Sequence, residues 1–163
     1  MHSFQLSGLP EQAFSSLFEL SDAELAARNM QRIRADSHPG FPCRVSLADA
    51  EIGEELLLLA FEHQPGASPY RASGPIFVRR RASQAVFPIG AVSPYVTSRM
   101  ISLRAYDANH SMVSAEVCEG PNLESHIERA FADEMTTDLH LHHAGRGCFF
   151  CRVDRAAVDS SNQ

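Results

Sequence analysis

The stretch DLHLHHAGRGCFFCRVD (residues 138–154) predicts a β-hairpin with unusual side chains. Its turn is AGRG (144–147), and apolar residues alternate with polar ones before and after it, as in two paired antiparallel strands. Successive side chains of a strand point to opposite faces of a sheet. With this turn, His140 faces Cys151 and His142 faces Phe149, so two histidines and one thiol share a face of the hairpin.

This face has the donor set of a metal site. Facing residues of paired strands lie roughly 5 Å apart, and a pairing shifted by one residue exchanges Cys151 for Cys148 but keeps a thiol beside the histidines. Two imidazoles and a thiolate can hold zinc with one position open, as in catalytic zinc sites. His140, His142 and Cys151 are therefore candidate metal ligands. Two alternatives stay open: the histidines transfer protons without a metal, or they are structural and bond to water or carboxylates.

The spacing of Cys148 and Cys151 does not predict a redox pair. Two phenylalanines separate the thiols and the strand continues beyond them, so the thiols point to opposite faces, and a disulfide would require the strand to bend. Cys43 and Cys118 have the surroundings of buried strand residues. In a cytoplasmic chain all four cysteines are expected to be reduced.

The rest of the chain predicts an α+β fold in one domain, residues 1–163, with a frayed polar tail at about 156–163. We expect a mostly antiparallel sheet of about five to seven strands, with short N-terminal helices and one helix near 122–134 packed on it. Apolar periodicity, caps and turn residues predict the following elements: short helices over 9–18 and from Asp22, the second with Ser21 and Glu24 as a capping box; a central strand over 56–63, covered on both faces; a long loop over 64–75; a strand over 76–80; a hairpin over 99–117; and an amphipathic helix over 121–134 with Asn122 as its N-cap.

A second group of candidate residues surrounds the end of the central strand. His63 ends this strand where it enters the long loop. Arg71 in the loop can hold a carboxylate or a phosphate, and Ser73 and Tyr70 can add a hydroxyl and an aromatic wall. Arg104, on the hairpin over 99–117, is a further candidate to line the entrance of this ligand site. The alternative for Arg71 is a structural role, in which it pairs with an acidic side chain and fixes the loop.

The composition excludes several classes of protein. The net charge is −6 and the only basic run is RRR (79–81), which argues against a nucleic-acid partner. The chain has no lysine, which excludes Schiff-base and pyridoxal-phosphate enzymes, P-loop nucleotide-binding proteins and protein kinases. No apolar run approaches the roughly 20 residues of a membrane helix, and MHSFQLSGLPEQ (1–12) lacks the pattern of a signal peptide. We therefore expect a cytoplasmic protein without a membrane partner.

Several segments together resemble a known family. SGLP, PGFPCRVSLADA, EHQPGASPYRASGPIFVRR, SLRAYDA and HHAGRGCFFCRVDR occur in this order over nearly the whole chain, and PYRASGPIFV is the most specific of them. The chain resembles a family of small bacterial proteins catalogued as domain of unknown function 1203. The resemblance implies a bacterial protein of about this length with a single domain, and it implies no activity.

Two hypotheses about function follow from the residues. In the first, the chain is a binding protein or enzyme for a small anionic molecule. Arg71, Ser73, Arg104 and Tyr70 would position the ligand, while His63, His140 and His142 would transfer a proton or bind zinc. In the second, it is a non-catalytic interaction module and forms a homodimer through these polar residues. The sequence does not decide between the two hypotheses.

Overall fold

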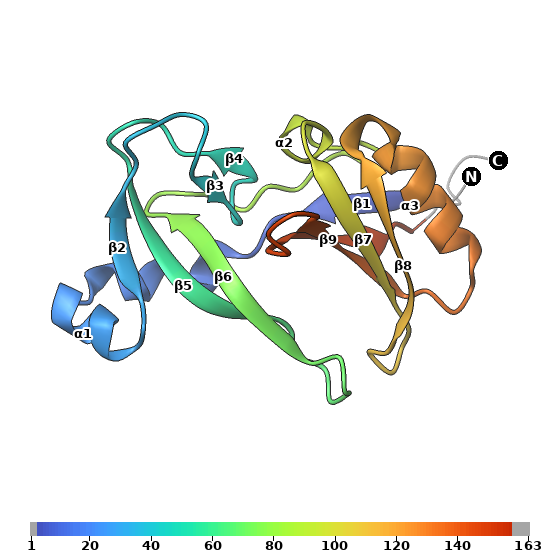
Figure 1. Cartoon of the computed structure of the whole chain (residues 1–163), viewed down its shortest axis with the longest axis horizontal. Helices are drawn as coiled ribbons and strands as arrows, with labels where there is room; N and C mark the ends of the chain where they lie inside the picture. The colour runs from blue at the N-terminus through green and yellow to red at the C-terminus, as the bar shows by residue number, and fades with distance from the viewer. Residues whose placement is uncertain (1–2, 158–163) are drawn as a thin grey trace.

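The fold is α+β and contains two five-stranded sheets (Figure 1). The computed structural model describes residues 3–157. One sheet has the strand order β1-β10-β9-β7-β8 and the other the order β2-β5-β6-β3-β4. The expected fold class is confirmed, but the expectation of a single sheet of five to seven strands is wrong. Alternation shows that a segment is a strand, and it does not show which strands pair.

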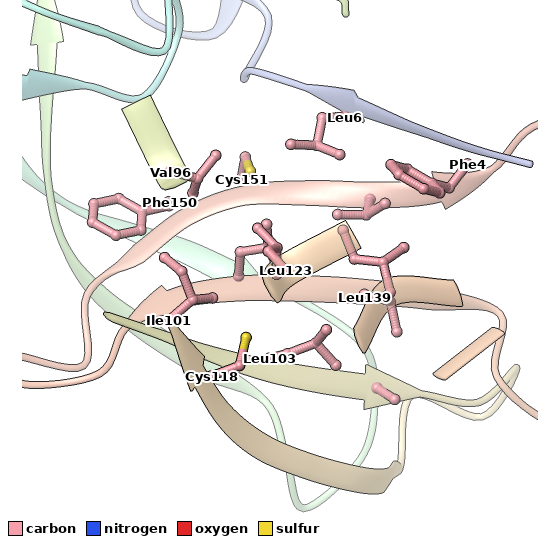
Figure 2. Close-up of a cluster of buried hydrophobic side chains, with 14 of the residues drawn as sticks. Phe4, Leu6, Val96, Ile101, Leu103, Cys118, Leu123, Leu139, Phe150 and Cys151 are labelled. Carbon is pink, nitrogen blue, oxygen red and sulfur yellow. The ribbon is translucent and has the colours of Figure 1, made fainter. Parts of the chain in front are cut away.

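The first sheet contains both predicted hairpins. All its neighbouring strands are antiparallel, and its strands are β1 (Phe4–Ser7), β7 (Met100–Tyr106), β8 (Met112–Glu119), β9 (Asp138–His143) and β10 (Phe149–Arg155). The predicted amphipathic helix, α3 (Leu123–Ala132), follows a short 3-10 turn (Gly120–Asn122), and Asn122 makes no side-chain cap bond. Helix α3 buries Leu123, Ile127 and Phe131 against one face of this sheet. Figure 2 shows the resulting core, in which Ile101, Leu103 and Leu139 of the sheet lie in one cluster with Leu123 of the helix.

The second sheet is built around the long strand β5 (Glu55–Gln64). β5 pairs with β2 (Gln31–Arg34) and with β6 (Ala72–Arg79), both antiparallel, and β6 pairs in parallel with β3 (Pro42–Cys43), which in turn meets β4 (Ala48–Asp49). Leu56 and Leu57 are both fully buried on opposite faces of β5. The prediction that the strand over 56–63 is covered on both faces therefore holds for its first residues and is wrong beyond Leu59, where Ala60 is exposed and residues 61–63 are half-buried.

The N-terminal segment covers one face of the second sheet through Phe14, Phe18 and Leu25. Helix α1 (Asp22–Ala27) begins with the predicted capping box, because Ser21 and Glu24 bond to each other's backbone. The predicted helix over 9–18 is instead two 3-10 turns, Glu11–Ala13 and Ser15–Glu19. A further short helix, α2 (Pro94–Thr97), starts with a proline.

The loop predicted over 64–75 is shorter than expected, because β6 begins at Ala72. Its tip packs on the tip of the β7–β8 hairpin, where the Ser68 hydroxyl donates to the His110 carbonyl at 2.8 Å. A Cβ atom on Gly66 would lie only 2.2 Å from the His110 ring, so only glycine fits there. The two hairpins, one from each sheet, are thus held together at their tips (Figure 1).

Two bulges change the direction of side chains near the middle of the molecule. The β5–β6 pairing shifts between Phe61 and Gln64, and the β10–β9 pairing shifts between Phe149 and Cys151. A bulge inserts an extra residue and re-aims the side chains beside it. Among residues 3–157, no helix is long and apolar enough to cross a membrane. The predicted frayed tail falls mostly outside the described residues.

Candidate metal centre

Three histidines from two sheets meet in one place. His140 and His142 lie on β9, on the face of the first sheet opposite α3, and His63 comes from the bulge at the end of β5. One nitrogen from each ring lies within 4.8 Å of the others. The His63 ring centroid is 4.8 Å from that of His142 and 6.1 Å from that of His140. The three histidines selected from separate parts of the sequence therefore form one cluster.

Cys151 is not part of this cluster, so its prediction as a facing neighbour of His140 is wrong. The bulge at Phe150 shifts the pairing, and Cys151 faces Leu141 while His140 faces Arg152. Cys151 is fully buried in the apolar core, near Val96 and Leu6 (Figure 2). Burial there raises the pKa of its thiol to about 12, which keeps the sulfur protonated and unsuited to metal binding.

Phe149, to which the sequence assigned no role, packs against all three histidine rings. Its ring stacks on His63 with the two planes 5° apart and the centroids at 5.5 Å, and it meets the other two rings edge-on. Phe149 itself is buried. The imidazoles thus lie against an apolar wall that excludes water from one side.

One clustered histidine has a hydrogen-bond partner that fixes which nitrogen carries the proton, and a second has a carboxylate beside it. The Nδ1 atom of His142 lies 2.8 Å from the carbonyl oxygen of Gly147, in the turn between β9 and β10. A carbonyl only accepts, so Nδ1 carries the hydrogen and Nε2 keeps its lone pair. The Nε2 atom of His140 lies 3.3 Å from Asp138 Oδ2, which favours the opposite tautomer with a free Nδ1 lone pair. Metal-bound histidines have this kind of outer partner, a carbonyl or a carboxylate, on the nitrogen that does not bind the metal.

Asp138 is ionised in these surroundings. Its burial opposes ionisation, but His140, Arg152 and the Thr137 hydroxyl together hold its pKa below the ordinary value. Oδ1 accepts from Thr137 at 3.0 Å, and Oδ2 lies 3.5 Å from an Arg152 nitrogen. Sequence reasoning missed Asp138, although it stands two residues before His140 and alternation therefore places both on one face.

The imidazoles of His63 and His142 are neutral at physiological pH. Burial lowers the pKa of His63 to about 4, with smaller contributions from His140 and Arg104. Burial lowers the pKa of His142 to about 3, against the opposing effect of its bond to Gly147. A neutral imidazole is the form that binds a metal ion.

One ring nitrogen of each clustered histidine has no hydrogen-bond partner within the described protein. These atoms are His63 Nδ1, His140 Nδ1 and His142 Nε2, and all three are buried. Buried polar atoms in proteins nearly always have a partner, so three exceptions in one place suggest a ligand site. In a tetrahedral zinc site with bonds of about 2.0–2.1 Å the nitrogens lie about 3.3 Å apart. The cluster fits such an ion after a modest closure of the rings.

Arg104 and Tyr106 border the cluster. Arg104 faces His140 across β7 and β9, and no carboxylate of residues 3–157 lies within salt-bridge distance of its guanidinium. Its charge helps to lower the pKa of both His63 and His142. The Tyr106 ring centroid lies 4.7 Å from that of His140, and burial raises the pKa of this tyrosine although Arg104 opposes the rise. Arg104 thus brings an unpaired positive charge to the edge of the histidines.

The other predicted ligand-binding residues lie farther out. Arg71 is exposed and donates to both carboxylate oxygens of Glu62, at 2.9 and 3.2 Å. This ion pair matches the structural role considered for Arg71, and it links the loop to the bulge that carries His63. Tyr70 is exposed but close enough to Tyr106 to affect its pKa. Ser73 lies within β6 and lines a shallow pocket with Asn29 and Gln31 (both outside the cluster). The structure does not bring Ser73 to the histidines.

These features define an α+β protein with a three-histidine cluster between two sheets, in which His140 and His142 are buried and His63 is half-buried. The chain belongs to the family described as "Protein of unknown function (DUF1203)", which matches residues 40–155. The match includes all three histidines, Asp138 and Arg104, and it confirms the resemblance noted in the sequence. No curated protein and no solved structure matches the chain.

Proposed function

We propose that the protein binds a divalent transition-metal ion, zinc in the first place, through His63, His140 and His142, and that this ion acts on a small anionic ligand. The observation that carries the proposal is the meeting of three buried, unpartnered imidazole nitrogens in one place. The carboxylate and the carbonyl beside two of these rings support it, because metal-bound histidines have such partners on the nitrogen that does not bind the metal.

A metal explains the cluster better than proton transfer alone. A general acid or base works best when its pKa lies near the working pH, whereas the pKa values of His63 and His142 lie near 4 and 3. Each of the three imidazoles offers one nitrogen within 4.8 Å of the others, so a single cation between the rings can be bound by all three. Three nitrogen ligands also leave one position of a tetrahedral zinc ion open, as catalytic sites require.

Arg104 supports the anionic nature of the ligand. Its guanidinium lies beside the cluster, partly buried and without a carboxylate partner among the described residues. A guanidinium binds carboxylate or phosphate oxygens by two parallel hydrogen bonds. A bound zinc ion would supply polarisation of a ligand oxygen or a water molecule with a lowered pKa. Arg104 would hold the anion in place, and Phe149 would exclude bulk water.

We keep the non-catalytic interaction module as a second candidate, with a homodimer as its form. Strand β8 is an edge strand, and its Val113 and Val117 side chains are exposed, the latter by 61%. An edge strand with exposed apolar residues can pair with another strand. We also propose that the protein is bacterial and resides in the cytoplasm, where its four free cysteines would stay reduced.

Metal analysis of the untagged protein tests the main proposal. The purified chain should bind about one zinc ion, and His142→Gln should weaken binding at least a hundredfold because a ligand is lost. His126→Gln is the matched control, because this histidine lies on α3 and pairs with Glu116 away from the cluster. Failure of the wild-type chain to bind zinc, cobalt or nickel, or equal zinc binding by both variants, would refute the metal centre. Size-exclusion chromatography separates the second candidate, since a homodimer without metal binding would favour it.

A further inference from the structure

A cavity of about 460 Å³ lies beside the β9–β10 turn, and none of the three clustered histidines belongs to its lining. It is lined by residues of both sheets, among them Arg44, Arg99, Arg146, His143, Phe77 and Phe150. Three arginines and no acidic residue belong to its lining, in a chain whose net charge is −6. Pockets of this size take small organic molecules.

Arg44 is the central charge of this cavity. It is only 3% exposed, and its Nε and Nη1 atoms donate to the carbonyls of Phe149 and Pro42 at 2.6 and 2.5 Å. Its Nη2 atom has no hydrogen-bond partner among residues 3–157, and no carboxylate there lies within salt-bridge distance. A buried charge is costly unless it is paired. An anion in the cavity would pair it.

The other polar side chains of the cavity are donors as well. Arg99 pairs with Asp49 at 3.4 Å on one side, and its guanidinium lies over the rings of Tyr95 and Phe150. The Nδ1 atom of His143 accepts from the backbone N–H groups of residues 145 and 146, so its hydrogen is on Nε2. Arg146 is exposed on the turn and has no carboxylate partner among the described residues. These hydrogen-bond donors suit a ligand group that only accepts hydrogen bonds.

The remaining lining is apolar and defines the body of the ligand. Leu58, Pro75 and Phe77 form one wall, and Phe150 lies beneath the guanidinium of Arg44, 5.0 Å from its central carbon to the ring centroid. We propose that this cavity is a second ligand site, which binds a small organic oxyanion, a carboxylate or a phosphate monoester, on an apolar or aromatic body. The arginines hold the oxyanion, and the apolar wall covers the body.

Isothermal titration of the full chain, treated with a chelator so that no metal contributes, tests this site. Benzoate and phenyl phosphate are the probes, and neutral benzamide is the control for the apolar part. We expect benzoate, phenyl phosphate or both to bind with a Kd below about 1 mM, and benzamide at least tenfold more weakly. Binding of only one of the two anions identifies the class of oxyanion.

Variants connect the binding to the cavity. Arg146→Gln, an exposed change that should leave the fold intact, should raise the Kd of the bound anion roughly tenfold or more. Arg81→Gln is the matched control, an exposed arginine outside the cavity, and should leave the Kd unchanged. Absence of binding by both anions, equal binding of benzamide, or an unchanged Kd in Arg146→Gln would overturn the proposal.

Discussion

Acidification should destabilise this protein well before its carboxylates are protonated, because the buried His142 and the half-buried His63 are held as neutral rings. Their pKa values are about 4 and about 3 in the folded chain, against 6.5 for a histidine in an unfolded chain. Below pH 6.5 the unfolded state therefore takes up protons that the folded state does not. The free energy of unfolding must fall as the pH falls from 6.5 toward 4, and the effect is complete only below pH 3.

The size of this effect follows from the two pKa values. At pH 5 each histidine lowers the free energy of unfolding by about 2 kcal/mol relative to pH 8, so the pair contributes about 4 kcal/mol. The total stability of a small domain is about 5–15 kcal/mol. Such a loss is large enough to move the urea midpoint strongly, and the histidine variants isolate it from other groups that titrate.

Urea unfolding of the metal-free protein at several pH values between 5 and 8 measures the effect. The wild-type chain should lose about 4 kcal/mol across this range from these two histidines, and His63→Gln and His142→Gln should each remove about half of that dependence. An equally steep pH dependence in wild type and both variants would refute the reasoning. It would mean that the two rings are protonated in the folded state or are accessible to water.

Three further predictions concern single positions. Asp138→Asn should weaken zinc binding by about 10–100-fold without unfolding the chain, because it removes the charge behind His140; unchanged affinity in a zinc titration would contradict this role. Gly66→Ala should destabilise the chain by about 1–3 kcal/mol in thermal unfolding, because a Cβ there meets the His110 ring, whereas Gly74→Ala, with nothing within 4 Å of its Cβ, should change little. Cys151→Ser should leave the visible spectrum of the cobalt-loaded protein unchanged, because Cys151 lies in the apolar core. A thiolate charge-transfer band that is present in the wild type and absent from the variant would contradict a centre with nitrogen ligands only.

Much of the fold follows from local patterns in the sequence. The two hairpins of the first sheet, helix α3 and the capping box at Ser21 all have signals within a few residues, and all are confirmed. The division into two sheets has no such signal, since it depends on which strands meet in space. The same holds for the contact between the tips at Gly66 and His110.

The candidate site, like the fold, could be predicted from the sequence only where local patterns decide the position of a side chain. Alternation is enough to place His140 and His142 on one face, and the strand end is enough to select His63. The error at Cys151 has a single cause, because one extra residue in β10 reverses the side of every later residue and leaves no mark in the pattern of apolar residues. Phe149 was visible in the sequence as a neighbour of His142, but its stacking on His63 required the position of the other sheet.

The extra residue at Phe150 also bears on the chemical durability of the protein. Mild oxidants and alkylating agents attack thiolates, and a centre with a sulfur donor loses its ion when that donor is modified. Here the bulge keeps the Cys151 sulfur inside the apolar core, away from the face that carries the histidines, and imidazoles are less reactive than thiolates toward these reagents. A metal centre made of these three imidazoles alone would therefore lose no donor to thiol oxidation.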